Sequence, residues 1–436
     1  MRPSSRVPSG RLNRLLQLGT TGARMAAGGL VEKGRRLKER AEQELPHALL
    51  TADNAKLLAE RLARLRGAAM KVGQMLSMEG DSMLPKEFAK ALEVLRSSAH
   101  TMPEGQVRQV LTAAYGPDWQ DLFAEFELTP MASASIGQVH RAVARDGREV
   151  AVKLQYPGVA ESIDSDVDNL RSLLRLARLV PSELDLDPLT DEVKAELRKE
   201  VDYERELQQL LAYRDALGER PGLRLPQPHA DLSRPRVLAL ELVPGVPLLT
   251  WGEHAPQEQR DAVATRLLEL LATELFDIGL MQTDPNPANY LYDADREDLV
   301  LLDFGATREV PPDVADLYRQ AFSGIAARDE DRLRDVLLRL GIGGTAEDRE
   351  DSDILIRVAL EASEVLDEGG YDFAASDLPE RLQALGKELR RYRTQLRPPP
   401  PAYLFFQRKL GGTFLLCRQL RARTNGRAAL RAAGAL

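Results

Sequence analysis

Three polar residues in one short stretch of the chain have the types and the spacing for phosphoryl-transfer chemistry. Asp284 is followed five residues later by Asn289, and the apolar run 299–302 leads into Asp303 in the sequence Asp-Phe-Gly. In such chemistry one carboxylate lies beside the acceptor hydroxyl, while an amide oxygen and a second carboxylate hold Mg²⁺ against the phosphates. Asp-Phe-Gly alone is a weak signal, because a strand that ends in a glycine turn also produces it. The preceding Asp-x-x-x-x-Asn motif makes the joint pattern much more specific.

A lysine upstream extends the pattern, and protein kinases have the same order of motifs. Lys153 ends the strand-like segment Val-Ala-Val-Lys, where kinases carry the lysine that contacts the α- and β-phosphates. A lone strand lysine would more often be solvated, but the downstream motif favours the functional interpretation. Residues 191–217 predict one helix with Asp202 and Glu206 on the same face, and a carboxylate of this helix should pair with Lys153. Taken separately, each acid would be a solvated charge.

The segment before the lysine predicts three antiparallel strands across residues 126–158, with a turn at Asp146-Gly147. The place of a kinase glycine-rich loop is taken by Ala132-Ser133-Ala134-Ser135-Ile136-Gly137. This loop has one glycine, so its backbone should approach phosphates less freely.

A second apolar segment, residues 237–243, predicts a buried strand that ends at Pro244-Gly245. Its position fits a hinge at which the backbone from Glu241 to Val243 could hydrogen-bond to adenine. The sequence contains no Gly-x-x-x-x-Gly-Lys-Ser/Thr loop that would favour a Walker-type ATPase instead.

Length and composition indicate a globular chain of two or three domains, or a two-lobed enzyme with an extension: 436 residues, 43% of them apolar. One cysteine, Cys417, excludes an internal disulfide framework, and five scattered histidines lack zinc-ligand spacing. Mg²⁺ on oxygen ligands is the only metal indicated. No apolar run approaches the roughly 20 residues of a membrane-spanning helix, and no signal-peptide core follows the basic start, so a cytoplasmic location is expected.

Charge is unevenly distributed along the sequence. Residues 1–40 hold ten Lys/Arg and two acids, a net charge of +8, which leaves −16 on the rest of a chain whose net charge is −8. The acidic body argues against nucleic-acid binding. The basic arm could bind an anionic membrane surface, and a flexible basic tail without a lipid partner remains the alternative.

Together the patterns predict an α+β fold of the two-lobed protein-kinase type, with a small antiparallel-sheet lobe, a helical lobe and a helical N-terminal extension. The predicted segments are a basic extension (1–45), a helical extension (46–125), the small lobe with a helical insert (126–243) and the helical lobe (244–436). Further helices are predicted over 164–179, 258–278, 312–365, 377–394 and 402–423.

With these motifs in place, the chain resembles the AarF/UbiB family of atypical kinase-like proteins, in the branch that supports coenzyme Q. The resemblance covers most of residues 7–425, and the combination of Lys-x-Gly-Gln with Glu-x-Asp is specific to that family among kinase-like folds. The segments that carry it are Lys71-Val72-Gly73-Gln74, SASIGQVHRA, VAVKLQYPG, ESIDSDVDNL, Glu200-Val201-Asp202-Tyr203, the Asp284 loop, Asp303-Phe304-Gly305 and PPPPAYLFFQRKLGG.

The resemblance implies a role for each matching residue. Lys71 and Gln74 would lie over the cleft near Glu200 and Asp202, where a protein kinase admits a peptide, which disfavours protein substrates. The remaining implied roles are a Lys153–Glu206 pair, Mg²⁺ ligation by Asn289 and Asp303, a catalytic Asp284 and a nucleotide loop at residues 132–135.

Some positions depart from the family pattern, which leaves nucleotide preference and turnover open. Ser133 stands where alanine is usual, and Gln282-Thr283 replaces His-Ala before the catalytic loop. Asn286 and Ala288 likewise replace His and Gly.

The function expected from these features is slow Mg²⁺-dependent ATP hydrolysis in support of ubiquinone biosynthesis. The expected partners are ATP or ADP, isoprenoid-quinone precursors, quinone-biosynthesis proteins and an anionic membrane surface. Two alternatives stay open: a phosphotransferase acting on a small molecule or lipid, and a nucleotide-binding scaffold without turnover. Retention of Lys153, Asp284, Asn289 and Asp303 argues against the scaffold.

Overall fold

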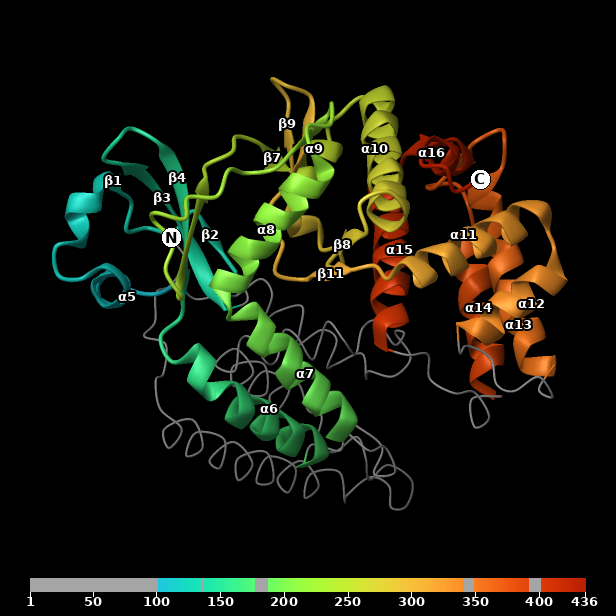
Figure 1. Cartoon of the computed structure of the whole chain (residues 1–436), viewed down its shortest axis with the longest axis horizontal. Helices are drawn as coiled ribbons and strands as arrows, with labels where there is room; N and C mark the ends of the chain where they lie inside the picture. Colours follow the sequence, from blue (N-terminus) through green and yellow to red (C-terminus); the bar gives the residue numbers. More distant parts are fainter. Residues whose placement is uncertain (1–100, 135, 177–186, 341–348, 392–400) are drawn as a thin grey trace, which may run out of the picture. The chain divides into compact units, whose positions relative to one another are not determined.

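The structure is a computed structural model that describes residues 101–134, 136–176, 187–340, 349–391 and 401–436. It divides into two compact units. Among the described residues, the first unit contains those from 101 to 207 together with 227–242, and the second contains those within 208–226 and 243–436 (Figure 1). Residues 208–226, which the sequence analysis assigned to the small lobe, therefore group with the second unit.

The first unit is built on an antiparallel sheet, as predicted. Its strands run in the order β1-β3-β4-β6, with β2 paired to β3. They are β1 (Phe123–Phe126), β2 (Ala132–Ser133), β3 (Gly137–Ala144), β4 (Glu149–Gln155) and β6 (Val237–Glu241).

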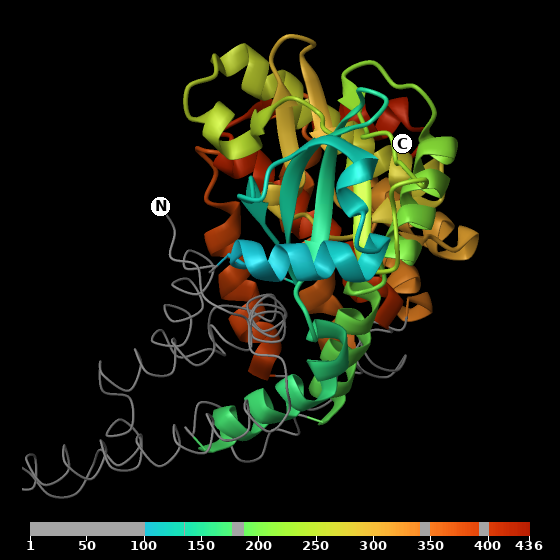
Figure 2. The same cartoon turned by 90° about the vertical axis from the view of Figure 1, so that its left-hand side faces the viewer.

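Buried and more exposed side chains alternate along β4, so one face of the sheet is buried. Val150, Val152 and Leu154 are fully buried, while the residues between them are more exposed. Helix α5 (Glu104–Tyr115) packs into the same core and crosses the strands (Figure 2). The sequence analysis placed the helix before residue 126 in the extension, but α5 shares its core with the strands; the 3₁₀ turn η2 (Trp119–Leu122) connects it to β1.

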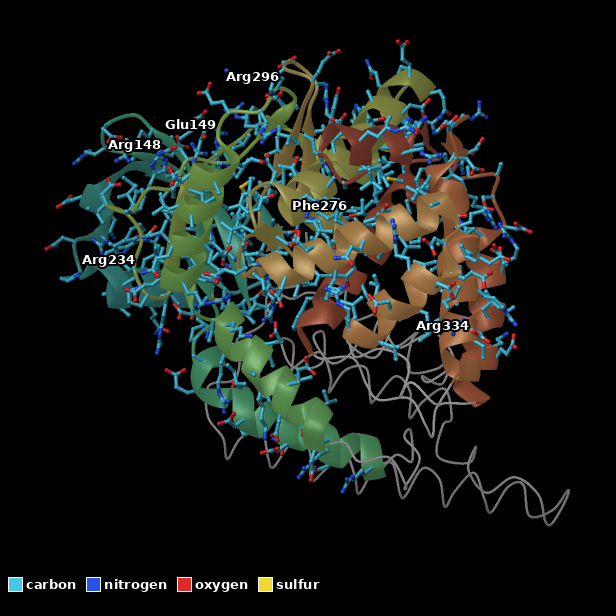
Figure 3. The ribbon with its side chains drawn as sticks, turned by 45° about the vertical axis from the view of Figure 1, so that its right-hand side comes forward. Arg148, Glu149, Arg234, Phe276, Arg296 and Arg334 are labelled. Atoms are coloured by element: carbon cyan, nitrogen blue, oxygen red, sulfur yellow. The ribbon has the colours of Figure 1, made fainter. Side chains whose placement is uncertain are left out.

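The predicted turn between β3 and β4 is present. Gly147 has φ +90°, which favours glycine, and its N–H donates to the carbonyl of Ala144. Arg148, labelled in Figure 3, follows in the same turn. Its guanidinium donates to Asp231 at 2.6 Å, which ties the hairpin to the segment that leads into β6.

Three helices follow β4: α6 (Val159–Leu176), α7 (Asp187–Glu200) and α8 (Tyr203–Leu217). Helices α6 and α7 lie side by side (Figures 1 and 2). The single helix predicted over 191–217 was wrong, because the chain breaks between α7 and α8. Asp202 lies in this break and accepts the N–H of Arg205 at 2.9 Å, a capping contact that begins α8.

The second unit is mainly helical. Its helices are α9 (Leu248–Gly252), α10 (Gln257–Phe276), α11 (Pro312–Ala327), α12 (Glu330–Arg339), α13 (Arg349–Glu361), α14 (Leu378–Arg391), α15 (Pro401–Gln419) and α16 (Gly426–Ala432), with 3₁₀ turns η3 (Pro287–Asn289) and η4 (Ala362–Leu366). The helices predicted over 258–278, 377–394 and 402–423 are confirmed with slightly different ends. The helical prediction for 312–365 corresponds to α11, α12, α13 and η4, whereas α16 was not predicted.

Short strands in the second unit position the Asp284 loop and the Asp-Phe-Gly segment. One sheet has the order β5-β10-β9-β7, and two further pairs are β11-β8 and β12-β13. The strands are β5 (Leu223–Arg224), β7 (Val246–Pro247), β8 (Leu280–Gln282), β9 (Tyr290–Asp293), β10 (Asp298–Leu301), β11 (Thr307–Glu309), β12 (Tyr371–Asp372) and β13 (Arg423–Thr424).

Helices α10 and α15 supply much of the interior of this unit. Leu271 and Leu275 of α10 share a cluster with Phe406 of α15 and Met281 of β8. Cys417 of α15 is fully buried, and burial raises the pKa of its thiol to about 12. Within the described residues, no helix has the length and apolar character needed to cross a membrane.

Candidate active site

The proposed catalytic carboxylate is held at both of its oxygens. Asp284 follows β8, and its Oδ1 accepts a hydrogen bond from Nη2 of Arg408 at 2.6 Å. Its Oδ2 accepts from Nδ2 of Asn289 at 3.3 Å, and the same amide nitrogen donates to the Asp284 carbonyl at 3.2 Å. Only 19% of the Asp284 side chain and 11% of the Arg408 side chain are exposed. The contact is therefore a partly desolvated ion pair. Removing one partner of such a pair costs more than removing one partner of an exposed surface pair.

A hairpin brings Asn289 next to the Asp-Phe-Gly segment. Strands β9 and β10 pair with Tyr290 opposite Leu301, and the N–H of Leu302 donates to the Asn289 carbonyl at 3.0 Å. Asn289 thus lies beside the residue that precedes Asp303. The Oδ1 of Asp303 accepts the N–H of Gly305 at 3.0 Å, which fixes the start of the turn.

The donor set of this hairpin fits Mg²⁺. Both hydrogen bonds of the Asn289 side chain use its nitrogen, and no donor among the described residues reaches its Oδ1. The described part of the chain holds no group of three or more His, Cys, Asp or Glu side chains that could form a metal cage. Mg²⁺ commonly takes only one or two protein oxygens and completes its shell with water and substrate phosphates. Asn289 and Asp303 provide that kind of partial site.

Gln282 connects the catalytic loop with the Asp-Phe-Gly segment. Its Nε2 donates to the carbonyls of Asp284 and Asp303, each at 3.0 Å. Next to it, the hydroxyl of Thr283 donates to the carbonyl of Ala306 at 2.7 Å. The two residues that depart from the family pattern before the loop therefore both bond to backbone around the site.

A buried ion pair contacts Gln282. Lys409 of α15 and Glu274 of α10 are 3.0 Å apart, with side-chain exposures of 2% and 0%. Glu274 Oε1 also accepts the N–H of Gln282 at 3.0 Å and the hydroxyl of Tyr213 at 2.8 Å. Lys409 donates to Gln282 Oε1 at 3.3 Å and to the Tyr290 hydroxyl at 3.4 Å.

The protonation states of this cluster follow from its burial and charges. Burial alone would lower the pKa of Lys409, but the charge of Glu274 together with the interactions with Tyr290 and the hydrogen bonds to both groups outweighs burial, and the pKa is raised. Burial, reinforced by Glu274, raises the pKa of Tyr213 well above its usual value, and burial raises that of Tyr290. Lys409 is thus a cation, and both tyrosines keep their hydroxyl protons at neutral pH.

The first unit contains the ion pair that the resemblance implied. Lys153 Nζ of β4 donates to both carboxylate oxygens of Glu206, each at 2.9 Å, and the side chains are 15% and 5% exposed. Glu206 lies in the first turn of α8, just after the cap at Asp202. The ammonium also lies 5.0 Å from the ring centre of Tyr203. The break between α7 and α8 therefore sets where Glu206 meets the lysine.

The candidate nucleotide loop is a tight connection between β2 and β3. The N–H of Ala134 donates to the carbonyl of Gly137 at 2.9 Å, so this donor is already used inside the turn. Ala132 and Ser133 pair with β3, whereas Ser135 lies outside the described residues. A Cβ on Gly137 would lie 2.2 Å from the Leu154 carbonyl oxygen, so only glycine fits this close approach of two strands.

The candidate hinge follows β6. The N–H of Glu241 donates to Gln227 O at 2.8 Å and that of Leu242 to Glu149 O at 3.0 Å. No acceptor within the described chain takes the N–H of Val243, which leaves it as the backbone donor suited to a base. The Glu241 side chain accepts the N–H of Gln227 at 3.0 Å.

The proposed regulatory residues are described only in part. Glu200 is the last residue of α7, and Asp202 lies in the break and caps α8. Lys71 and Gln74 lie outside the described residues, and their predicted contact with these acids stays a prediction.

The sequence analysis did not identify the residues of α10 and α15 that hold Asp284 and Gln282 in place. Glu274, Arg408 and Lys409 were not singled out, and Gln282 was noted only as a departure. One signal was available: Arg408 and Lys409 are two adjacent cations in a largely apolar helix with few other charges, where a cation needs a partner if it is buried.

The fold and the site together define a protein of the kinase-like class: an antiparallel sheet with its lysine–glutamate pair in one unit, and a catalytic loop with Asp-Phe-Gly in a helical unit. Residues 94–337 match the family described as ABC1 atypical kinase-like domain. The chain belongs to this AarF/UbiB family of atypical kinase-like proteins.

Individual relatives agree with this assignment. "Atypical kinase COQ8B, mitochondrial" of Rattus norvegicus is 38% identical over 420 residues, which cover 96% of this chain and 79% of the rat protein. "Atypical kinase COQ8, mitochondrial" of Saccharomyces cerevisiae is 32% identical, with 96% of this chain and 84% of the yeast protein covered. A solved structure, "The complex structure of Rv3197-erythromycin from Mycobacterium tuberculosis", superimposes with a TM-score of 0.60 at 29% identity and covers 88% of this chain and 96% of that chain.

Proposed function

We propose that this atypical kinase-like protein binds ATP with Mg²⁺ and hydrolyses it slowly in support of ubiquinone biosynthesis. The observation that carries the proposal is the arrangement of the Asp284 loop: a carboxylate fixed at both oxygens, with Asn289 aligned by a hairpin beside the Asp-Phe-Gly segment. The names of the rat and yeast relatives supply the coenzyme Q context. A mitochondrial location is part of those names and is not carried over to this chain.

Each residue then has a defined task. Lys153, held by Glu206, contacts the α- and β-phosphates, and Val243 offers its N–H to the base. Asn289 and Asp303 hold Mg²⁺, which neutralises phosphate charge when bound. Asp284 orients the attacking oxygen, and the rigid contacts to Arg408 and Asn289 keep its carboxylate in one rotamer.

The acceptor is proposed to be water. The alternative of a hydroxyl-bearing small molecule or lipid uses the same residues, because Asp284 would orient that hydroxyl in the same way. Product analysis separates the two: release of free phosphate without a phosphorylated acceptor supports hydrolysis. A phosphorylated lipid or precursor would replace the ATPase proposal with a phosphotransferase.

The binding test is Asp303→Asn, which removes the charge of one proposed Mg²⁺ ligand. We expect the affinity for MgATP measured by calorimetry to fall at least tenfold, because a carboxylate is lost from a site with only two protein ligands. Asp295→Asn is the matched control, since Asp295 is exposed in the turn of the same hairpin. Equal MgATP affinity in the Asp303 and Asp295 variants would show that the metal assignment is wrong.

A further inference from the structure

Helix α15 contacts the catalytic loop at three positions within one and a half turns. These positions are Arg408, Lys409 and Gly412. The helix is more than 100 residues from the loop in sequence, and none of its residues belongs to the phosphoryl-transfer motifs. The contacts differ in chemistry but converge on the segment 282–285.

The first contact sets the orientation of the carboxylate. Arg408 donates to Asp284 Oδ1 at 2.6 Å, while Asn289 occupies Oδ2. A carboxylate held at one oxygen can still rotate about its terminal torsion, whereas one held at both is fixed. Arg408 provides the stronger of the two contacts, because it is charge-assisted and shorter.

The second contact sets the backbone of the loop. Lys409 donates to Gln282 Oε1, and the Nε2 of that glutamine holds the carbonyls of Asp284 and Asp303. Glu274 completes the arrangement by pairing with Lys409 and accepting the N–H of Gln282. The buried lysine therefore acts on the catalytic loop through one amide side chain.

The third contact is a close approach that requires glycine. A Cβ on Gly412 would lie 2.0 Å from Cγ and 2.3 Å from Cβ of Pro285, the residue directly after Asp284. The neighbouring Gly411 has no atom within 4 Å of an added Cβ. The two glycines share one helix, and only Gly412 is needed for the loop to lie against it.

The geometry points to α15 as the positioning element of the catalytic loop, with Arg408 as the residue that orients the Asp284 carboxylate. This inference rests on the proposed function, because it predicts that loss of Arg408 slows ATP hydrolysis. Arg408 acts through Asp284 and is a positioning residue. Lys409 is unsuited to a first test, since its removal would leave Glu274 as an unpaired buried charge and could prevent folding.

The first experiment is a double-mutant cycle on ATP hydrolysis. Arg408→Gln is expected to lower kcat at least tenfold with the KM for MgATP within twofold, and Arg408→Lys to recover part of the loss. In an Asp284→Asn background, Arg408→Gln should change kcat less than twofold, because the group that it orients is gone. Arg418→Gln is the control, since Arg418 lies on the same helix and pairs with Glu380 at 3.3 Å.

The second experiment does not depend on turnover. Hydrogen exchange of a peptide spanning residues 282–290 should speed up at least tenfold in Arg408→Gln relative to Arg418→Gln, because the loop loses its anchor. Unchanged exchange, or a kcat loss of the same size with and without Asp284, would overturn the positioning role. Equal ATP hydrolysis by the parent protein and Asp284→Asn would instead refute the proposed function, and the exchange result would still decide the role of Arg408.

Discussion

His140 shows how one buried side chain of the first unit makes stability depend on pH. Its Nδ1 lies 2.7 Å from the Glu127 carbonyl, so the ring proton is assigned there and Nε2 accepts from the Gln138 amide at 2.8 Å. The oxygen of that amide accepts the N–H of Met102 at 2.9 Å, which fixes the orientation of the amide. A proton on Nε2 would face an N–H donor. Burial lowers the pKa of His140, although the bond to Glu127 opposes the shift.

We predict that the first unit loses stability as the pH falls below about 6.5, the ordinary histidine pKa. The folded-state pKa of His140 lies below the unfolded one, so the unfolded chain binds the proton first. The contribution is complete above pH 6.5 and is lost as the pH falls toward the folded-state pKa, by at most about 1.4 kcal/mol per pH unit for one histidine. Chemical denaturation at pH 7.5 and pH 5.5 measures this loss.

His140→Gln should make the difference between the two pH values smaller. His229 remains and shifts in the same direction, because burial and the charge of Arg148 lower its pKa, so the dependence is reduced but not abolished. A Trp251→Phe background leaves Trp119, buried in the first unit, as the fluorescent reporter of this unit. His254→Gln serves as the control, because His254 is exposed. An unchanged pH dependence in His140→Gln would contradict the assignment.

Site residues that lie close together in the sequence could be predicted. The residues that hold them in place from far along the chain could not. Asp284, Asn289 and Asp303 lie within twenty residues, and local hairpin geometry brings them together. Arg408 meets Asp284 only because α15 packs beside β8 in the folded unit. No local spacing rule connects positions 124 residues apart.

At the scale of elements, helix α15 has two adjacent glycines with opposite surroundings. We predict that Gly411→Ala raises the thermal unfolding temperature, because alanine is favoured over glycine in a helix by up to about 1 kcal/mol and the added methyl group meets no atom. Gly412→Ala should lower it by an amount that corresponds to about 1–3 kcal/mol of overpacking, because the methyl group would displace Pro285.

The two variants are compared by thermal unfolding and by ATPase assay side by side. Gly411→Ala should keep parent-like kcat, while Gly412→Ala should lower kcat through displacement of the loop. Similar unfolding temperatures and similar turnover in both variants would mean that the approach of α15 to the loop is not tight.

The helix break before α8 was missed for a physical reason. Good helix formers such as Glu200 and Glu204 lie close to Val201 on both sides, so the periodic pattern continues through the break. Asp202 was the available signal, since aspartate is a preferred helix cap, but it was interpreted as a charge on a helix face. The sheet was easier to predict, because alternation in β4 and the Asp146-Gly147 turn are both local.

At the scale of the whole molecule, the charge is segregated along the chain. The net charge is +8 for residues 1–40 and −16 for the remainder. A segment with this charge is expected to be attracted to anionic lipid by up to about 1 kcal/mol for each basic residue at the surface, reduced by salt screening.

We predict that the full chain floats with anionic liposomes more than a shortened chain that begins at Pro46. The difference should shrink at high salt and vanish with neutral liposomes, because the attraction is electrostatic. Flotation assays at two salt concentrations check this. Equal flotation of the two chains on anionic liposomes would remove the case for membrane attachment through this segment.

Because Cys417 is buried, the rate at which a thiol reagent labels it measures how often the surrounding structure opens. The chain has a single thiol, fully buried on α15, and its raised pKa suppresses the reactive thiolate. A thiol reagent can therefore modify the folded protein only after the surroundings of this helix open. The labelling rate at increasing reagent concentration approaches a plateau, and that plateau is the opening rate of the helix that carries Arg408 and Lys409. A ligand that stabilises the packing of α15 against the Asp284 loop is expected to slow the labelling of Cys417, and this native thiol would then report on such binding without an engineered label.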